Sequence, residues 1–380
     1  MRLLVLGAGL QGSACAYDLL TQDDVEGVTL ADLDPTGASF LPGDPRLRRL
    51  ALDFSDHTAL REAMDGHDVV LSAAPYYFNG DLARLAISAG LDYSDLGGNT
   101  DIVFEQLDMA GEAGDAGCTA VPDVGLAPGM INVLAAEAIR RLDEAESVIM
   151  YVGGLPQHPH PPLNYQVVYS LEGALDYYTT PSWIVRGGRR QRIDALSELE
   201  TLEFGELGEL EAFHTGGGAS TMPFRFEGRV DRLEYKTLRY PGHAHIMQAI
   251  RELGLLSQEP VEVDSAEVAP RDVFLACAKP HLTFPGEPDL VALRVVARGT
   301  RGGRPTTLVY ELLDRENRET GITAMERTTG FTLSIVGLFL GRDVIEEAGV
   351  FAPDEAIPAD IYLQELDDRG IRVRLTETEG

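Results

Sequence analysis

The segment VLGAGLQGSA, which begins at Val5, constrains the fold of this chain more than any other part of the sequence. It places Gly7, Gly9 and Gly12 in a GxGxxG pattern, directly after an apolar run and at the start of a helical pattern. Glycine is needed here for a tight turn, for close approach of the backbone to a pyrophosphate and for close packing of the helix. The next apolar run ends in Asp32, twenty residues after Gly12, where a dinucleotide-binding fold needs a carboxylate for ribose hydroxyls. The pattern therefore predicts a Rossmann-type domain at the N-terminus.

The first 125 residues alternate short apolar runs with helical patterns. The apolar runs are LLVLGA, GVTLAD, RLALDF, DVVLSAAP, LDYSDLG and CTAVPDVG. Repeated strand and helix patterns are typical of a parallel sheet covered by helices on both faces. Residues 35–49 carry little helical pattern, and we expect a loop there. We therefore predict an α/β chain whose residues 1–125 form a Rossmann-type, doubly wound parallel sheet.

The pattern of apolar residues changes from alternating strand and helix to closely spaced strands after a helical pattern at residues 128–142. Strand-like runs such as SVIMYVGG, RLEYKTLRY and VALRVVARG then follow one another with few helices between them, as in antiparallel sheets. We predict a second α+β domain at residues 126–322, with a mostly antiparallel sheet, for substrate binding and dimerisation. Residues 323–380 are expected to be helical and to return to the Rossmann domain. Sheet edges in the second domain make a homodimer the expected assembly.

The excess of acidic over basic residues argues against anionic binding partners. The chain has 31 Lys and Arg against 61 Asp and Glu, a formal net charge of −30. Nucleic acid and anionic membranes are therefore not expected partners, because both require clusters of basic residues. An acidic excess of this size suits a saline cytoplasm, since about 1 M salt shortens the Debye length to about 3 Å. A GC-rich genome would also replace Lys with Arg, but it does not account for the excess of acids.

The cysteines and the N-terminus indicate a soluble, cytoplasmic protein. Cys15, Cys118 and Cys277 lack the spacing of a zinc site or a disulfide framework, which suits a reducing compartment. The first apolar run enters the glycine pattern in place of a cleavage site, so no signal peptide is expected. The apolar stretch at residues 330–340 is too short to span a bilayer.

The cofactor is expected to be NAD, with NADP less favoured. Asp32 is followed by Leu33 and Asp34, and no Arg or Lys stands there to receive a 2′-phosphate. The expected cofactor contacts come from the glycine loop and from the ends of neighbouring strands. They are Gly7, Gly9, Leu10, Gln11, Gly12, Asp32, Asp53, Ala73, Ala74 and Pro75.

The order of motifs along the chain resembles the saccharopine dehydrogenase superfamily, and within it the lysine 6-dehydrogenase branch. The resemblance is carried by VLGAGLQG, YSDLGG, PDVGLAPGMIN, YVGGLP, EAFHTGGGAST, LEYKTLRYPGHA and TAMERTTGFTLS, which together extend over nearly the whole chain. Saccharopine reductases of this superfamily carry Asp and Cys where this chain has Ala127 and Val152. The resemblance therefore implies an NAD-dependent oxidation of the ε-amine of lysine to allysine, with release of ammonia and cyclisation to a piperideine carboxylate.

Two other functions are compatible with the sequence. One is a saccharopine reductase or a synthase of the carboxyspermidine type, which condenses an amine with an aldehyde before reduction. The other is a regulator that binds the dinucleotide and has lost the chemistry. The enzyme hypotheses differ in the co-substrate that they require.

An amine must be neutral before the adjacent carbon can lose hydride, so a nearby group has to accept a proton. The chain has two lysines, Lys236 and Lys279, and Lys236 lies within a motif, so it is a candidate general base or water-orienting group. The alternative is a lysine that only packs along a strand. His243 is a second candidate for proton transfer, because the ordinary pKa of His lies near neutrality. Arg239 offers a planar fork for the substrate carboxylate, or a plain salt bridge.

The carboxyl ends of the sheet strands supply the remaining candidates. Asp95 follows the fifth predicted strand and is the third catalytic candidate, and residues 123–129 follow the sixth. Pro128 and Gly129 lie at the expected start of a helix, whose free amides would suit a substrate carboxylate. Tyr165, Tyr169 and Glu172 could hold the substrate ammonium or could be core and cap residues. The paired histidines lack a third ligand at a recognisable spacing, so no metal is expected.

Overall fold

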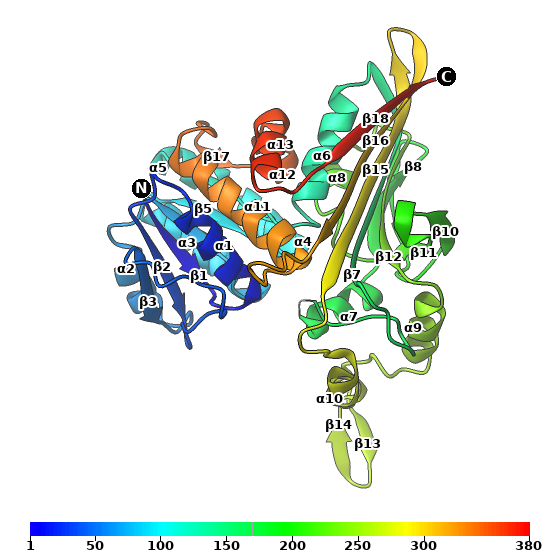
Figure 1. Cartoon of the computed structure of the whole chain (residues 1–380), viewed down its shortest axis with the longest axis horizontal. Helices are drawn as coiled ribbons and strands as arrows, with labels where there is room; N and C mark the ends of the chain where they lie inside the picture. The colour runs from blue at the N-terminus through cyan, green and yellow to red at the C-terminus, as the bar shows by residue number, and fades with distance from the viewer. Residues whose placement is uncertain (169) are drawn as a thin grey trace. The chain divides into compact units, whose positions relative to one another are not determined.

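The computed structural model describes residues 1–168 and 170–380, which form two compact units. Unit 1 contains Met1–Arg141, Ser220–Met222 and Glu316–Val373. Unit 2 contains Leu142–Ala219, Pro223–Arg315 and Arg374–Gly380. Figure 1 shows both units, coloured along the chain. Among the described residues, no helix has the length and apolar character that crossing a bilayer requires.

Unit 1 is built on a parallel sheet of seven strands in the order β17-β6-β5-β4-β1-β2-β3. Every adjacent pair in this sheet is parallel, which confirms the predicted doubly wound sheet. The strands are β1 (Arg2–Leu6), β2 (Gly27–Asp32), β3 (Leu47–Ala51), β4 (Val69–Ser72), β5 (Asp92–Asp95), β6 (Thr119–Val121) and β17 (Gly349–Val350). Because β1 and β4 consist mostly of apolar residues that are buried on both faces, they occupy the centre of the sheet.

The helices of unit 1 begin and end at recognisable signals. Asp56 caps α2 by accepting hydrogen bonds from two backbone amides, and Gly117 ends α5 in the left-handed conformation. Gly330 lets α11 approach α1, because a Cβ atom there would lie 2.6 Å from the carbonyl oxygen of Gln11. The helices are α1 (Leu10–Leu20), α2 (His57–Met64), η1 (Tyr76–Phe78), α3 (Asn79–Ser88), α4 (Thr100–Leu107), α5 (Ala110–Ala116), α6 (Met130–Arg140), α11 (Ala324–Gly341), α12 (Pro353–Ala356) and α13 (Ala359–Asp368).

Unit 2 contains a sheet of nine strands, in which only the β12–β7 pair is parallel among the described pairings. The main path runs β10-β11-β12-β7-β15-β16-β18, and β8 pairs with both β12 and β9. The predicted antiparallel character is therefore confirmed. The strands are β7 (Glu144–Pro156), β8 (Ser182–Arg186), β9 (Arg189–Ile193), β10 (Glu200–Glu203), β11 (Glu209–His214), β12 (Arg232–Arg239), β15 (Asp289–Arg301), β16 (Arg304–Arg315) and β18 (Arg374–Glu379).

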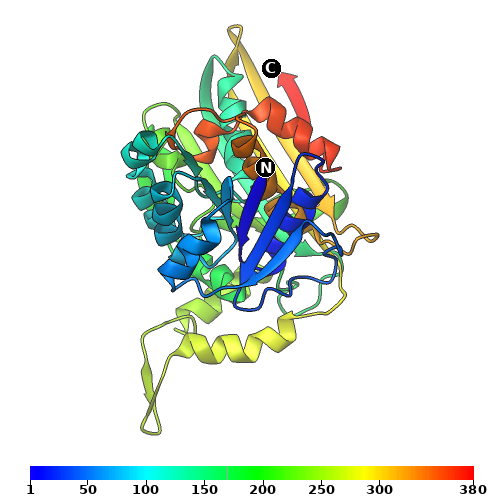
Figure 2. The ribbon, with the colours of Figure 1, turned by 90° about the vertical axis from the view of Figure 1, so that its left-hand side faces the viewer.

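A small arm extends from the rest of unit 2, as Figures 1 and 2 show. It contains the two-stranded hairpin of β13 (Val261–Val263) and β14 (Ala266–Val268), together with α10 (Pro270–Leu282). Val261 and Val263 on the hairpin and Val273 on α10 are exposed. The other helices of this unit are α7 (Leu171–Thr179), η2 (Gly205–Leu207), α9 (His243–Glu252) and α8 (Met222–Arg225), whose first residue is grouped with unit 1.

The two units differ from the expected domain boundaries in two places. Unit 1 continues past residue 125 to Arg141, because α6 packs against α12 and α13 of the same unit. The C-terminal segment is grouped with unit 1 only as far as Val373, since β18 pairs with β16 of the second sheet. The expected loop at 35–49 ends at Leu47, where β3 begins.

Candidate active site

The loop between β1 and α1 is packed so closely that two of its glycines cannot carry a side chain. A Cβ atom at Gly7, where φ is +103°, would lie 2.6 Å from the carbonyl oxygen of Ala73, and one at Gly12 would lie 1.8 Å from that of Gly7. A Cβ atom at Gly9 would meet nothing within 4 Å. Packing of the chain therefore does not require glycine at position 9, and the open space there fits the approach of a pyrophosphate to the first turn of α1.

The first two residues of α1 lie at this open position. Leu10 is 51% exposed, and both amide atoms of the Gln11 side chain are buried without a hydrogen-bond partner. A buried amide without partners is costly, and a polar ligand would remove this cost. The residues around the glycine loop therefore fit a bound dinucleotide.

Asp32, at the end of β2, holds the glycine loop in place by hydrogen bonding. Its Oδ2 atom accepts a hydrogen bond of 2.8 Å from the backbone amide of Ala8, and its Oδ1 atom accepts one of 3.3 Å from Asp34. The structure also places Arg49 of β3 near the loop that follows β2, because its Nε atom donates to the carbonyl oxygen of Thr36 at 3.2 Å. Arg49 lies seventeen residues beyond Asp32 in sequence, so the motif at Asp32 does not identify it as a contact for a 2′-phosphate.

The other expected cofactor residues lie on two loops of unit 1. Ala73 contacts Gly7 as described, and Ala74 and Pro75 continue the loop after β4. Asp53 lies in a separate turn after β3, exposed, with its Oδ1 atom accepting hydrogen bonds from the amide and hydroxyl of Ser55. The structure thus brings the β4 loop against the glycine loop, whereas the contacts of Asp53 lie within its own turn.

Asp95, at the end of β5, is fully buried and its carboxylate is well supplied with donors. Its Oδ1 atom accepts from the amides of Gly97 at 2.7 Å and Asp123 at 3.1 Å, and its Oδ2 atom accepts from Gln106 at 2.6 Å. Burial raises the pKa of Asp95, while these donors lower it in part. The contacts suit a residue that holds the neighbouring loop in place.

Asp123 lies two residues beyond β6, within the segment 123–129 that was expected at this edge of the sheet with no role predicted for Asp123 itself. It is buried, its φ is +71°, and its Oδ2 atom accepts a short hydrogen bond from the hydroxyl of Ser220. Its Oδ1 atom is buried and has no hydrogen-bond partner. Burial raises the pKa of Asp123 to about 7; the Ser220 hydroxyl lowers it and the charge of Asp95 raises it. A carboxyl group with this pKa can exchange a proton near neutral pH.

The start of α6 differs from the expectation of free amides at Pro128 and Gly129. The Gly129 amide donates to Asn132 Oδ1 at 2.7 Å, and the Met130 amide donates to the carbonyl oxygen of Gly125 at 2.8 Å. The next two amides also donate within the loop. These donors close the turn of the GLAPG motif, so they are not free for a substrate carboxylate.

In unit 2, Arg239 lies in a group of buried aromatic and polar side chains. Its guanidinium stands 4.8 Å from the centre of the Tyr165 ring, and its Nε atom donates to the hydroxyl of Tyr178 at 3.1 Å. His243, the first residue of α9, contacts the same hydroxyl at 2.9 Å through Nε2 and the carbonyl oxygen of Leu163 at 2.9 Å through Nδ1. Burial and the charge of Arg239 lower the pKa of His243 to about 3. The structure therefore brings three expected site residues together, with the histidine neutral.

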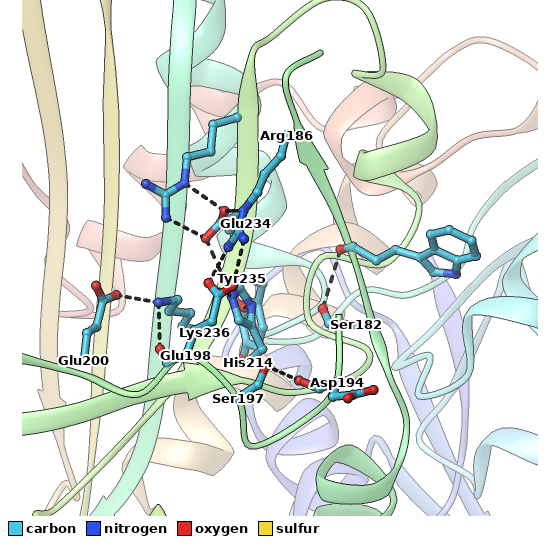
Figure 3. Close-up of polar contacts among 12 residues, drawn as sticks. Ser182, Arg186, Asp194, Ser197, Glu198, Glu200, His214, Glu234, Tyr235 and Lys236 are labelled. Carbon is cyan, nitrogen blue, oxygen red and sulfur yellow. Dashed lines mark hydrogen bonds and ion pairs between the residues drawn. The ribbon is translucent and has the colours of Figure 1, made fainter. Parts of the chain in front are cut away.

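Lys236 lies on the opposite face of β12 from Arg239, because side chains alternate along a strand and these residues are three positions apart. Its Nζ atom is 3.0 Å from Glu200 Oε1 and donates to the carbonyl oxygen of Glu198 at 3.2 Å. The side chain is almost fully buried. Figure 3 shows this ion pair. The structure thus separates Lys236 from His243 within unit 2.

A network of charged side chains lies on the same face of β12 as Lys236 (Figure 3). The buried Glu234 carboxylate is 2.6 Å from Arg186 Nε and 2.8 Å from Arg232 Nε. Burial alone would raise the pKa of Glu234, but Arg232 and Arg186 outweigh it and lower that pKa to about 2. Glu198 also binds Arg186. Each of these acids is therefore held as an anion by an arginine.

Within the part of the chain that the structure describes, the same network contains three side chains whose ligand atoms are close enough to hold a metal ion. They are Glu198, His214 and Glu234. His214 Nε2 is buried without a hydrogen bond, 3.4 Å from the Glu198 carboxylate and 3.7 Å from that of Glu234. The carboxylates already bind the guanidinium groups of Arg186 and Arg232. A divalent ion would have to compete with these two cations, so the arrangement does not favour a metal.

The remaining candidates lie near α7. Glu172 is exposed in its first turn, where Ser170 donates to its carboxylate at 3.1 Å. Tyr169 lies outside the described residues. Tyr165 is buried and precedes the helix, whereas Glu172 is the second residue of the helix.

Two family models match this chain. The model described as "Saccharopine dehydrogenase NADP binding domain" matches residues 3–121, and the one described as "Saccharopine dehydrogenase C-terminal domain" matches residues 125–371.

Curated relatives match at low identity. Saccharopine dehydrogenase [NADP(+), L-glutamate-forming] of Schizosaccharomyces pombe is 25% identical over 276 residues, which is 70% of this chain and 60% of that protein. The chain thus spans about three fifths of the length of this relative and of its Saccharomyces cerevisiae counterpart. Carboxynorspermidine synthase of Vibrio alginolyticus is 22% identical over 334 residues, 82% of this chain and 78% of that protein.

Two solved structures share the fold over almost the whole chain. Apo saccharopine dehydrogenase (L-Glu forming) from Saccharomyces cerevisiae superposes with a TM-score of 0.81 at 20% identity, covering 99% of each chain. The homospermidine synthase of Legionella pneumophila in complex with NAD superposes with a TM-score of 0.73 at 12% identity, covering 99% of this chain and 91% of that one.

Proposed function

Because the chain belongs to the saccharopine dehydrogenase family, we propose that it catalyses a pyridine-nucleotide-dependent oxidation at a C–N bond of an amino acid. The proposed substrate is L-lysine, oxidised at its ε-amine to allysine with release of ammonia. The observation that carries this choice is the pair Ala127 and Val152, which stand where saccharopine reductases carry polar residues. Val152 is buried in β7, so it offers a large substrate no polar contact.

The residues of each unit have separate roles in this proposal. A bound nicotinamide nucleotide supplies the hydride acceptor, and the glycine loop, Gln11 and Asp32 hold it. Arg239 binds the substrate carboxylate, supported by its orientation on Tyr165 and Tyr178. Lys236, His243 and Asp95 stay predictions as catalytic groups. The contacts of Lys236 with Glu200 and a carbonyl oxygen also suit a residue that holds the sheet together.

NAD is the proposed cofactor, although the matching family model is described as NADP-binding and the first curated relatives use NADP(+) by name. Asp32 supports NAD, because a carboxylate accepts hydrogen bonds from ribose hydroxyls and repels a 2′-phosphate. The related homospermidine synthase structure contains NAD. Arg49 is the residue that would favour NADP if it turned toward the ribose.

One assay distinguishes the proposed reaction from its alternatives. The purified protein is incubated with L-lysine and NAD as the only substrates, and formation of reduced nicotinamide is followed by its absorbance. We expect turnover with these two substrates alone. If reduction or oxidation instead requires saccharopine, or an aminoaldehyde with an amine, the lysine proposal is wrong.

The second candidate is a condensing reductase of the carboxynorspermidine synthase type. The observation that favours it is the alignment with the Vibrio alginolyticus enzyme, which covers 78% of that protein. Such an enzyme would consume reduced cofactor only when an amine and an aldehyde are both present. A regulator that only binds the dinucleotide would turn over none of these mixtures.

A homodimer in a saline cytoplasm completes the proposal. The β13–β14 hairpin has only two strands and exposes Val261 and Val263, and a two-stranded hairpin alone has little stability in water. A second copy that covers this arm would bury these residues. Light scattering on the eluting protein in low and high salt tests this, and a monomer at every salt concentration would contradict it.

A further inference from the structure

We propose that Asp123 is a proton-transfer residue of this enzyme, held in position by Ser220 and Asp95. The inference rests on the proposed oxidation of an amine and names the group that accepts the amine proton. Asp123 lies two residues after β6, at the carboxyl end of the parallel sheet. In open α/β sheets, ligands bind at this edge. Asp123 belongs to unit 1 together with the cofactor loop and Ser220.

The backbone at Asp123 and Ser220 is held in an unusual conformation. Asp123 has φ of +71° and Ser220 has φ of +46°, and neither is glycine. Such conformations cost free energy and persist only where the surrounding structure enforces them, often at functional sites. The two residues meet through the hydrogen bond from the Ser220 hydroxyl to Asp123 Oδ2, although 97 positions separate them in sequence.

Neighbouring groups leave one oxygen of Asp123 available. A Cβ atom at Gly97 would lie 1.7 Å from Asp123 Oδ1, so the absence of a side chain at Gly97 makes room for this oxygen. Oδ1 itself is buried and makes no hydrogen bond of ordinary geometry, although the nearby amide of Gly98 also lowers the pKa of this carboxyl group. Asp95 fixes the backbone, because its carboxylate accepts from the amides of both Gly97 and Asp123. Oδ2 is therefore used for positioning, and Oδ1 is the oxygen that remains to accept a proton.

The charged groups that act on Asp123 come from two other elements of unit 1. Asp95 on β5 and Asp354 on α12 both raise its pKa by their negative charge, after the larger effect of burial. The hydroxyl of Ser220 acts in the opposite direction. This balance leaves the carboxyl group able to gain and lose a proton near neutral pH.

The proton has a defined course in the proposed oxidation. An N–H proton of the substrate ammonium passes to Asp123 Oδ1, and the amine becomes neutral. The nitrogen lone pair then forms the C=N bond while the hydride leaves the carbon for the nicotinamide nucleotide. Water adds to the iminium carbon, the C–N bond breaks, and ammonia leaves with a proton. Asp123 releases the proton that it accepted, so it is ionised again for the next cycle.

The titration of Asp123 can be measured without turnover. Infrared difference spectra between pH 5 and pH 9 should contain the C=O band of a protonated carboxyl group that disappears with a midpoint at about 7. Asp123→Asn should remove this band. Ser220→Ala should move the midpoint to higher pH, because a hydrogen bond that lowers the pKa is lost. Absence of the band in the wild-type protein, or its presence in Asp123→Asn, would overturn the proposal.

The pH profile of kcat supplies the functional readout. With lysine and NAD, kcat should rise with pH to a plateau above about 7, since the ionised carboxylate is the proton acceptor. Asp123→Asn should lower kcat by about 10² or more and abolish this limb, with cofactor affinity unchanged. Ser220→Ala should shift this limb to higher pH, because the hydrogen bond that lowers the pKa of Asp123 is lost.

Asp92→Asn is the matched control, because Asp92 is a partly buried aspartate with a raised pKa at the opposite end of β5. This variant should keep the wild-type limb. If lysine does not turn over, the proposed substrate is wrong, and the same profile is measured with the saccharopine or amine and aldehyde mixture that does. A limb near neutrality that persists in Asp123→Asn overturns the inference in either case.

Discussion

Asp123 of unit 1 and Glu234 of unit 2 are both buried carboxyl groups, but their pKa values move in opposite directions. Asp123 is 1% exposed and Glu234 is fully buried, so burial raises the pKa of each. Asp123 has a hydroxyl group and a second acid as neighbours, and its pKa rises to about 7. Glu234 has two guanidinium groups as neighbours, and its pKa falls to about 2.

The difference shows that burial alone does not assign a role to an acidic side chain. Arg186 and Arg232 keep Glu234 ionised at neutral pH and in mild acid, so it acts as a fixed anion that links β8 to β12. Among the described residues, no ion pair joins Asp123 to a basic side chain. A change of one proton is therefore accessible to Asp123 and not to Glu234.

Among the predictions that follow from this comparison, the largest effect is expected on the stability of a variant at Glu234. Glu234→Gln removes the charge but keeps the shape, and leaves two arginines without their buried anion. A shift from 4.5 to about 2 and the cost of breaking a buried ion pair both indicate a loss of about 3 kcal/mol in the free energy of unfolding. Urea unfolding at pH 7, followed by the fluorescence of Trp183 in β8, measures it.

Glu379→Gln is the control for this change, because Glu379 pairs with Arg304 at the surface of the same unit and exposed pairs contribute less than about 1 kcal/mol. The pH dependence gives a further check. A lowered pKa in the folded state means that the stability from Glu234 is present above pH 4.5 and is lost as pH falls through about 2. An equal loss of stability in both variants would contradict the assignment.

The same change at Asp123 should have the opposite sign. The folded-state pKa of about 7 lies above the ordinary value of 3.8. The unfolded chain therefore ionises first as pH rises, and stability is lost between about pH 4 and 7. Asp123→Asn removes this loss, so it should raise the free energy of unfolding at pH 8, the opposite of the expected effect of Glu234→Gln, with little effect at pH 4. Urea unfolding at both pH values measures this, and destabilisation at pH 8 would refute it.

The fold of unit 1 was readable from sequence because its signals are local. Each apolar run, with the glycine loop and Asp32, lies within a few residues of the feature that it specifies. The seventh strand was not predicted, since Gly349–Val350 is only two residues long and pairs with β6 from more than 200 positions away. The hydrogen bond between Asp123 and Ser220 was hidden for the same reason, because no local pattern connects them.

The charged groups of unit 2 depend on the pairing of strands, which the sequence alone does not specify. Alternation along β12 could have shown that Lys236 and Arg239 lie on opposite faces. The partners of Glu234 could not be found in this way, since Arg186 lies 48 positions away on β8. The role of a charged residue here depends on which strand becomes its neighbour.

A smaller effect is expected for a substitution at Arg239. This substitution tests whether unit 2 also contains a cation that binds the substrate. Arg239→Lys keeps the charge but loses the planar fork and the stacking on Tyr165. We expect a rise in KM for lysine of about thirtyfold, or roughly 2 kcal/mol, with kcat little changed. Steady-state kinetics measure it, with Arg298→Lys at the exposed surface of the sheet as control. A fall in kcat with KM unchanged would argue against a binding role.

The smallest expected effect concerns Asp32, the acid of unit 1 whose contacts are backbone amides. Its carboxylate accepts from Ala8 and Asp34 and faces a ribose in the proposed complex. Asp32→Ala should reduce the preference for NAD over NADP by about tenfold, mainly by weakening NAD, which corresponds to about 1.4 kcal/mol. Arg49→Gln is the companion variant. If Arg49 binds a 2′-phosphate, Arg49→Gln lowers kcat/KM with NADP and leaves kcat/KM with NAD unchanged. In that case, a preference of the wild-type protein for NADP would show that Arg49 outweighs Asp32. Ratios of kcat/KM for the two cofactors, measured at one high salt concentration for every variant, decide between the two residues.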